Sequence, residues 1–212
     1  IDQALVDLLL EPEIFQAIAE RLTKFYNEYL TRILESARGM IDLLVTGDDF
    51  GQQRGLLCSV ELWEKRLRAG FEGYIKLAHA AGVPVMHHTC GSIYRLLPRF
   101  IECGLDILQA LQPEVAEMDF RPIKAEFGGR MCFQGGIGIQ RALPFGTPED
   151  VRAEVRERIE ALAPGGGYIV STAHNIQGDT PVENVLALVK AYDEFGRYPI
   201  AISGRTKLIA GT

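Results

Sequence analysis

Short apolar segments alternate with amphipathic helices along most of this chain. Five of these segments are too short for core helices and are predicted as buried strands: residues 40–46, 83–86, 107–111, 131–133 and 168–171. The segments between them repeat apolar residues every three or four positions, as helices do, and residues 60–80 are predicted as one such helix. Because parallel strands need helical crossovers, this order predicts an α/β fold whose parallel sheet is covered on both faces. About five βα units fit into the chain, fewer than a closed (β/α)8 barrel needs.

Helix boundaries are marked by proline and capping residues. Residues 12–36 are predicted as a long amphipathic helix whose apolar stripe includes Ile14, Leu22 and Tyr29. Thr147 and Thr180 each precede a proline and an acidic side chain, which predicts two further helix starts, the second with a full capping box. Residues 199–203 are a candidate for a short final strand.

The charge balance argues against a nucleic-acid-binding protein. Lys and Arg total 22 against 28 Asp and Glu, a formal charge of −6, whereas proteins that neutralise phosphates are basic.

No apolar stretch approaches the roughly 18 residues of a membrane span, and no signal-like segment opens the chain. Four cysteines without a regular framework lead us to expect a reducing, cytoplasmic location. Since the chain begins at Ile1 and enters a helix almost at once, we expect a longer polypeptide.

Polar side chains gather where the predicted strands end. They are Asp48 and Asp49 after the first strand, His88 and Cys90 after the second, Gln109 in the third, Gln134 at the end of the fourth, and His174 and Asn175 after the fifth. Singly, each has an ordinary structural explanation, such as capping a helix or satisfying loop amides. The carboxyl ends of parallel strands share one rim, however, and this rim is where α/β proteins bind ligands. The group as a whole therefore predicts a functional site.

His88 and Cys90 form the sharpest local pattern. In extended backbone, residues i and i+2 project to the same side, so this imidazole and thiolate can hold one metal ion. Zinc accepts both donors, and a site with three protein ligands keeps a fourth position for substrate. The third ligand stays open. His174, at another strand end on the same rim, is the first candidate, and Asp48 and Asp49 are reserves.

Five segments carry a family resemblance: residues 83–91 (VPVMHHTCG), 134–137 (QGGI), 165–170 (GGGYIV), 173–175 (AHN) and 180–185 (TPVENV). Together they resemble the uroporphyrinogen decarboxylase superfamily, over about residues 41–192. The resemblance implies a TIM-barrel fold. It also implies that residues 1–212 are the carboxyl-terminal part of a single barrel domain, with the amino-terminal strands in a missing upstream segment or a partner subunit.

Two branches of this superfamily differ at the predicted metal site. His88, Cys90 and Gly91 match the HxCG metal motif of the corrinoid-dependent methyltransferase branch, which authentic decarboxylases generally lack. That branch often supplies a third zinc ligand as a cysteine from the last strand end, where this chain has His174. A histidine there is also compatible with the glycine-His-glycine loop of the decarboxylases. The third ligand therefore stays open.

The resemblance implies a zinc-assisted methyltransferase. It would move a methyl group between a corrinoid cofactor, carried on a partner protein, and a small thiol, ether or amine. Asp48 and Asp49 would orient a metal-bound histidine or act as general acids. Gln109, Gln134 and Asn175 would bind substrate or cofactor. Two alternatives remain: a uroporphyrinogen decarboxylase that uses no metal, and a corrinoid- or metal-binding module without catalysis.

Overall fold

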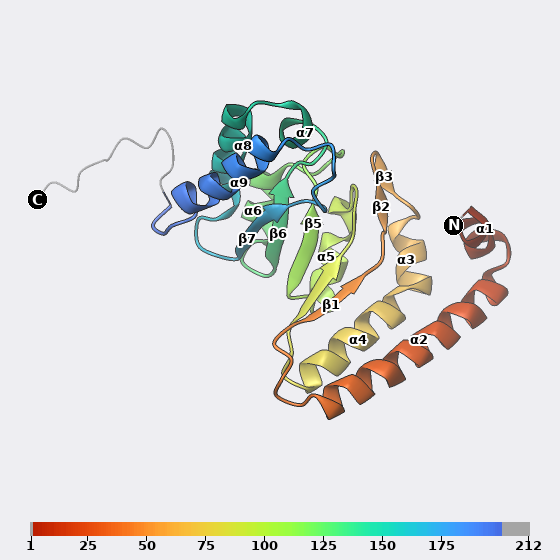
Figure 1. Cartoon of the computed structure of the whole chain (residues 1–212). Helices are drawn as coiled ribbons and strands as arrows, with labels where there is room; N and C mark the ends of the chain where they lie inside the picture. Colours follow the sequence, from red (N-terminus) through yellow and green to blue (C-terminus); the bar gives the residue numbers. More distant parts are fainter. Residues whose placement is uncertain (1, 201–212) are drawn as a thin grey trace, which may run out of the picture.

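A parallel five-stranded sheet organises the chain, which a computed structural model describes over residues 2–200 (Figure 1). Its strands follow the order β1-β4-β5-β6-β7, each paired in parallel with the next: β1 (Leu44–Gly47), β4 (Val85–His88), β5 (Ile107–Leu111), β6 (Cys132–Ile137) and β7 (Tyr168–Thr172). The predicted α/β class and the five βα units are confirmed. A two-stranded hairpin, β2 (Gly51–Gln52) with β3 (Gly55–Leu56), was not predicted.

Within residues 2–200, helices lie on one face of this sheet only. Because each crossover advances to the next strand in the same direction, right-handed connections place all helices on the same side. Val85, Leu108 and Phe133 on that side are completely buried. On the opposite, concave side, Val45 and Ile169 remain 54% and 44% exposed. The prediction that both faces are covered is therefore wrong, and the sheet forms the arc of a barrel whose interior stays open.

The helices largely follow the predicted pattern. Their bounds are α1 (Asp2–Leu10), α2 (Pro12–Ser36), α3 (Val60–Arg66), α4 (Arg68–Ala80), η1 (Tyr94–Leu96), α5 (Leu97–Glu102), α6 (Phe120–Phe127), α7 (Ala142–Phe145), α8 (Pro148–Leu162) and α9 (Val182–Phe195). The single helix predicted over residues 60–80 is divided at Leu67 into α3 and α4. No helix among residues 2–200 combines the length and the apolar character needed to cross a bilayer.

One of the two predicted threonine caps is confirmed. Thr147 and Asp150 form a reciprocal capping box at the start of α8. The capping box predicted at Thr180 is wrong, because α9 begins one residue later than that box requires, with Pro181 at the N-cap and no side-chain cap. The candidate strand over residues 199–203 falls largely outside the described residues.

An aromatic core joins the sheet to its covering helices. Trp63 on α3, Phe71 on α4 and Phe100 on α5 pack edge-to-face or stacked, with ring centroids 4.9 to 5.6 Å apart. Each such buried aromatic side chain contributes several kcal/mol, about 3–5 by the cost of its removal. This core fixes the outer face of β4 and therefore the direction of the side chains at the end of that strand.

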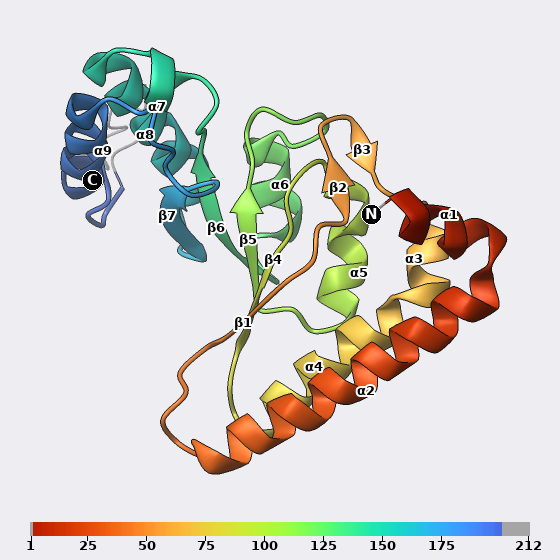
Figure 2. The same cartoon turned by 45° about the vertical axis from the view of Figure 1, so that its right-hand side comes forward.

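The apolar stripe of α2 faces solvent. This helix packs along α4 at the far end of the arc (Figure 2), and it does so with Leu30 and Leu34, which are buried. The stripe on its other side is more than half exposed and consists of Ile14, Ile18, Leu22, Phe25 and Tyr29. At the opposite end of the arc, α9 has a similar exposed stripe of Val182, Leu186 and Val189. Both ends of the open sheet thus carry uncovered apolar helix faces.

Candidate functional site

His88, Cys90 and His174 converge at the carboxyl rim of the sheet. One donor atom from each lies within 4.8 Å of the others. His88 Nε2 is 3.3 Å from Cys90 Sγ, and the His88 and His174 rings meet edge-on with centroids 5.8 Å apart. In a flat sheet, β4 and β7 would stand about 14 Å apart, three strand spacings. The curvature of the arc therefore brings the two strand ends together.

The turn that carries Cys90 is held by hydrogen bonds from several elements. Each of four consecutive backbone amides in this turn donates a hydrogen bond. The acceptors are the Gln109 carbonyl for Thr89, Asp49 Oδ1 for Cys90, Gln112 Oε1 for Gly91 and the Gln52 carbonyl for Ser92. Gly91 has φ +89°, and a Cβ there would lie 2.5 Å from the Gln52 nitrogen. The close approach of the hairpin therefore requires glycine at this position. Gln112, buried behind the turn, was not predicted as a positioning residue.

Asp48 and Asp49 lie beside this cluster. Asp49 Oδ1 accepts the Cys90 amide at 2.8 Å and lies 4.0 Å from His88 Nε2. Desolvation by the surrounding strand ends and the neighbouring charge of Asp49 raise the pKa of the Asp48 carboxyl, although the residue as a whole stays exposed. Asp49 is thus the acid that contacts the turn, whereas Asp48 has no side-chain contact with the cluster among the described hydrogen bonds.

The donor set fits a zinc ion. Zinc bonds of about 2.0 to 2.3 Å in tetrahedral geometry place ligand atoms about 3.3 to 3.8 Å apart. The 3.3 Å separation of His88 Nε2 and Cys90 Sγ falls at this spacing, and a movement of about 1 Å by the exposed His174 ring would bring in the third donor. Burial and the charge of Asp49 raise the pKa of the Cys90 thiol to about 11. A bound cation would oppose that effect, because coordinated thiols lose their protons.

The predicted substrate residues occupy the concave face near the cluster. His88, Gln109 and Gln134 are register partners across β4, β5 and β6, so their side chains lie in one row. Gln134 Nε2 donates to Ser171 Oγ at 2.8 Å, while Gln134 Oε1 is buried without a partner. Asn175 is exposed next to His174.

His87 is a site neighbour that the sequence did not reveal. It points away from the concave face into the aromatic core, stacks on Phe50 at 5.6 Å and is completely buried. The hydroxyls of Thr46 and Tyr74 each lie 2.9 Å from its Nδ1. Burial lowers the pKa of His87 to about 4, so the ring is neutral. The strand alternation that separates His87 from His88 is the one signal that could have indicated this role.

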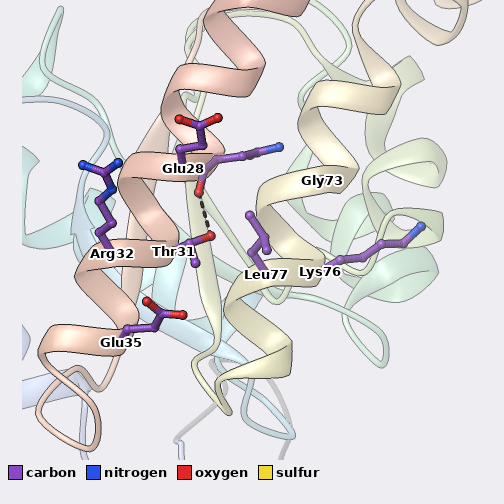
Figure 3. Close-up of a pocket in the computed structure, with 8 residues that line it drawn as sticks. Glu28, Thr31, Arg32, Glu35, Gly73, Lys76 and Leu77 are labelled. Carbon is purple, nitrogen blue, oxygen red and sulfur yellow. Dashed lines mark hydrogen bonds between the residues drawn. The ribbon is translucent and has the colours of Figure 1, made fainter.

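A groove of about 640 Å³ lies elsewhere, between α2 and α4 (Figure 3). Glu28, Arg32 and Glu35 line it from α2, and Gly73 and Lys76 line it from α4. A Cβ on Gly73 would lie 3.3 Å from the side-chain nitrogen (Nδ2) of Asn27, so the small residue permits close helix packing. The groove shares no residue with the rim cluster, and it is a feature of helix packing.

Known proteins share both the sequence pattern and the fold. The sequence profile of the family described as uroporphyrinogen decarboxylase (URO-D) matches residues 1–195. A methylated-thiol–coenzyme M methyltransferase of Methanosarcina mazei is 31% identical over 122 residues, 56% of this chain and 30% of the relative. A uroporphyrinogen decarboxylase of Ralstonia nicotianae is 28% identical over 183 residues, 80% of this chain and 49% of the relative.

A solved structure titled as a methyltransferase from Methanosarcina mazei has the same fold. It matches with a TM-score of 0.72 at 21% identity, over 92% of this chain and 54% of that chain. The chain thus spans about half, or less, of the length of the relatives that it matches. Because the family profile covers residues 1–195, the chain belongs to the uroporphyrinogen decarboxylase (URO-D) family.

Proposed function

We propose that this chain forms part of a zinc-assisted methyltransferase, which moves a methyl group between a corrinoid cofactor and a small thiol, ether or amine. The convergence of His88, Cys90 and His174 within 4.8 Å is the observation that carries the proposal. The likeness to a relative named as a methylated-thiol–coenzyme M methyltransferase supports it. When bound, zinc would act as a Lewis acid that lowers the pKa of a coordinated thiol and holds it as a thiolate.

The residues around the cluster would position the reactants. His88, Cys90 and His174 would hold the metal. Asp49, through its bond to the Cys90 amide, would fix the turn. Asp48, whose pKa is raised by desolvation and by the charge of Asp49, would serve as a proton donor. The polar side chains that would contact the methyl compound or the corrinoid are those at the concave face and its rim: Gln109, Gln134 and Asn175.

We also propose that the chain is the carboxyl-terminal part of one barrel domain, completed by an upstream segment or a partner subunit. The free edges of β1 and β7 and the exposed stripes of α2 and α9 support this, since each would be covered by further βα units. A separate corrinoid protein would then approach the rim. The free thiols of the described cysteines fit a reducing compartment, the cytoplasm.

The test combines metal content with turnover by the protein completed in this way. We expect one zinc per chain and methyl transfer from methylcobalamin to a small thiol, and we expect His88→Ala and Cys90→Ser to lose both. Cys103→Ser, which changes a buried cysteine at the C-cap of α5 away from the rim, is the matched control and should keep both. A folded protein without zinc, or activity that survives both rim substitutions, would refute the proposal.

Uroporphyrinogen decarboxylation is the second candidate. The relative from Ralstonia nicotianae, matched over 80% of this chain, favours it. Decarboxylation would require cationic side chains for the substrate carboxylates, and the inward positions of the five described strands hold no Lys or Arg. Conversion of uroporphyrinogen by the complete protein, unaffected by chelator, would reverse the ranking.

A further inference from the structure

The concave face of the sheet is built in layers. Register partners in a parallel sheet point to the same side, so the strands define rows across the arc. The lower row is apolar and consists of Val45, Met86, Ile107 and Cys132. The row above it consists of Gly47, His88, Gln109, Gln134 and Ile169. The cluster at the rim therefore adjoins two carboxamides and lies above an apolar floor.

No charge interrupts these rows. Their side chains are apolar or carboxamide, apart from the imidazole of His88, and the nearest acids, Asp48 and Asp49, lie on the rim. Some arginines lie beyond the strand ends. Of these, Arg95 is engaged by Glu117 at 2.7 Å, whereas Arg54 and Arg141 are exposed outside the strands. An anionic tail in the row would therefore have no described cation beside it, and burying an anion without a counter-charge is costly.

One acceptor in the row has no hydrogen-bond partner among the described residues. Gln134 Oε1 is buried and has no partner, although the Nε2 of the same amide is engaged by Ser171 at 2.8 Å. A buried acceptor of this kind is normally satisfied by a donor. Gln109 and Gln134 lie one and two strand spacings from His88, about 5 and 10 Å, so a short chain bound beside His88 and Cys90 reaches them.

We propose that the small molecule bound at this site carries an uncharged, hydrogen-bonding tail, and that Gln109 and Gln134 select it over an anionic tail. This inference rests on the proposed function, because it assumes that the reactive group lies beside His88 and Cys90. The inference does not follow from the name of the methylated-thiol–coenzyme M methyltransferase, because a substrate with an anionic tail would find no counter-charge in the row.

Two thiols of nearly equal size provide the test: 2-mercaptoethanesulfonamide, with an uncharged tail, and 2-mercaptoethanesulfonate, with an anionic one. The full chain is loaded with Co²⁺, and each thiol is titrated while the cobalt–thiolate absorption is followed. We expect 2-mercaptoethanesulfonamide to bind at least tenfold more tightly. Equal or tighter binding of the sulfonate would overturn the inference. This holds also if Arg54→Ala abolishes the binding of the sulfonate, because the protein would then supply a counter-charge.

A positive charge placed in the row gives a second test of this selection. Gln134→Lys should improve sulfonate binding roughly tenfold or more, by attraction at a few ångströms in a partly buried site. Gln140→Lys adds the same charge on an exposed loop and is the matched control. If both variants act alike, the row does not select the tail.

A second readout separates this inference from the proposed function. Failure of Co²⁺ to give a thiolate absorption band would refute the metal site alone. Ligand-detected NMR of the same two thiols with chelator-treated protein still measures their relative binding and its response to Gln134→Lys. A preference for the sulfonate there would overturn the inference whatever the metal does.

Discussion

Gly91→Ala should destabilise the protein through one close backbone approach. With φ at +89°, an alanine costs about 1 to 2 kcal/mol in backbone strain. Its Cβ would lie 2.5 Å from the Gln52 nitrogen and the Gly51 carbonyl carbon, which are backbone atoms and cannot rotate away. Displacing the hairpin adds about 1 to 3 kcal/mol. We therefore expect a loss of about 3 kcal/mol in the free energy of unfolding, measured by urea denaturation.

Gly82→Ala is the matched control, because Gly82 has φ +75° but no atom within 4 Å of the added Cβ. Only the backbone strain remains there, and the expected loss is about 1 kcal/mol. The difference between the two variants, about 2 kcal/mol, isolates the contact between the turn and the hairpin. Equal losses in both variants would refute the packing described around Cys90. Zinc affinity should fall in Gly91→Ala and stay unchanged in Gly82→Ala.

The remaining predictions concern His87, the core and α2. In the folded protein His87 has a pKa of about 4, whereas in the unfolded chain its pKa is about 6.5. Between these two pH values the unfolded chain binds a proton at His87 and the folded protein does not. Its contribution of about 3 kcal/mol is therefore fully present above pH 6.5 and is lost as pH falls towards 4, and His87→Gln should flatten this part of a chelator-treated urea stability profile. Trp63→Ala, in the closed aromatic core, should cost about 3 to 5 kcal/mol by the same assay. In the chain by itself, Ile18→Ser and Phe25→Ser should change stability by less than about 0.5 kcal/mol, because both side chains are exposed, and a larger loss would mean that the chain buries its own stripe.

The strands could be predicted from sequence because their apolar runs are short and bounded. The segment 107–111 was predicted with the bounds that β5 has. The break at Leu67 could not be foreseen, since both halves of residues 60–80 have helical periodicity and no glycine or proline marks the division. The β2–β3 hairpin was missed because strands of two residues carry no periodicity. Periodicity also showed that α2 has an apolar stripe but not whether the stripe is covered.

The site was predictable where topology alone determines proximity. Parallel strands end at one rim, so His88, Cys90 and His174 could be grouped from their positions after strands. Their role as metal ligands remains a prediction, as do the roles of the neighbouring acids and amides. The partners of the turn amides could not be foreseen, because Asp49 lies 41 residues from Cys90 and only the folded register brings them together. The role of His87 was not predicted, although strand alternation places it on the side opposite to His88.

X-ray absorption at the zinc edge of the zinc-loaded chain identifies the atoms that bind the metal. We expect one sulfur at about 2.3 Å and two imidazole nitrogens at about 2.0 to 2.1 Å, with the remaining position filled by water or an added thiol. His174→Ala should remove one imidazole from this shell and Cys90→Ser should remove the sulfur. A shell of oxygen atoms without sulfur, unchanged by either substitution, would rule out the zinc site at His88, Cys90 and His174.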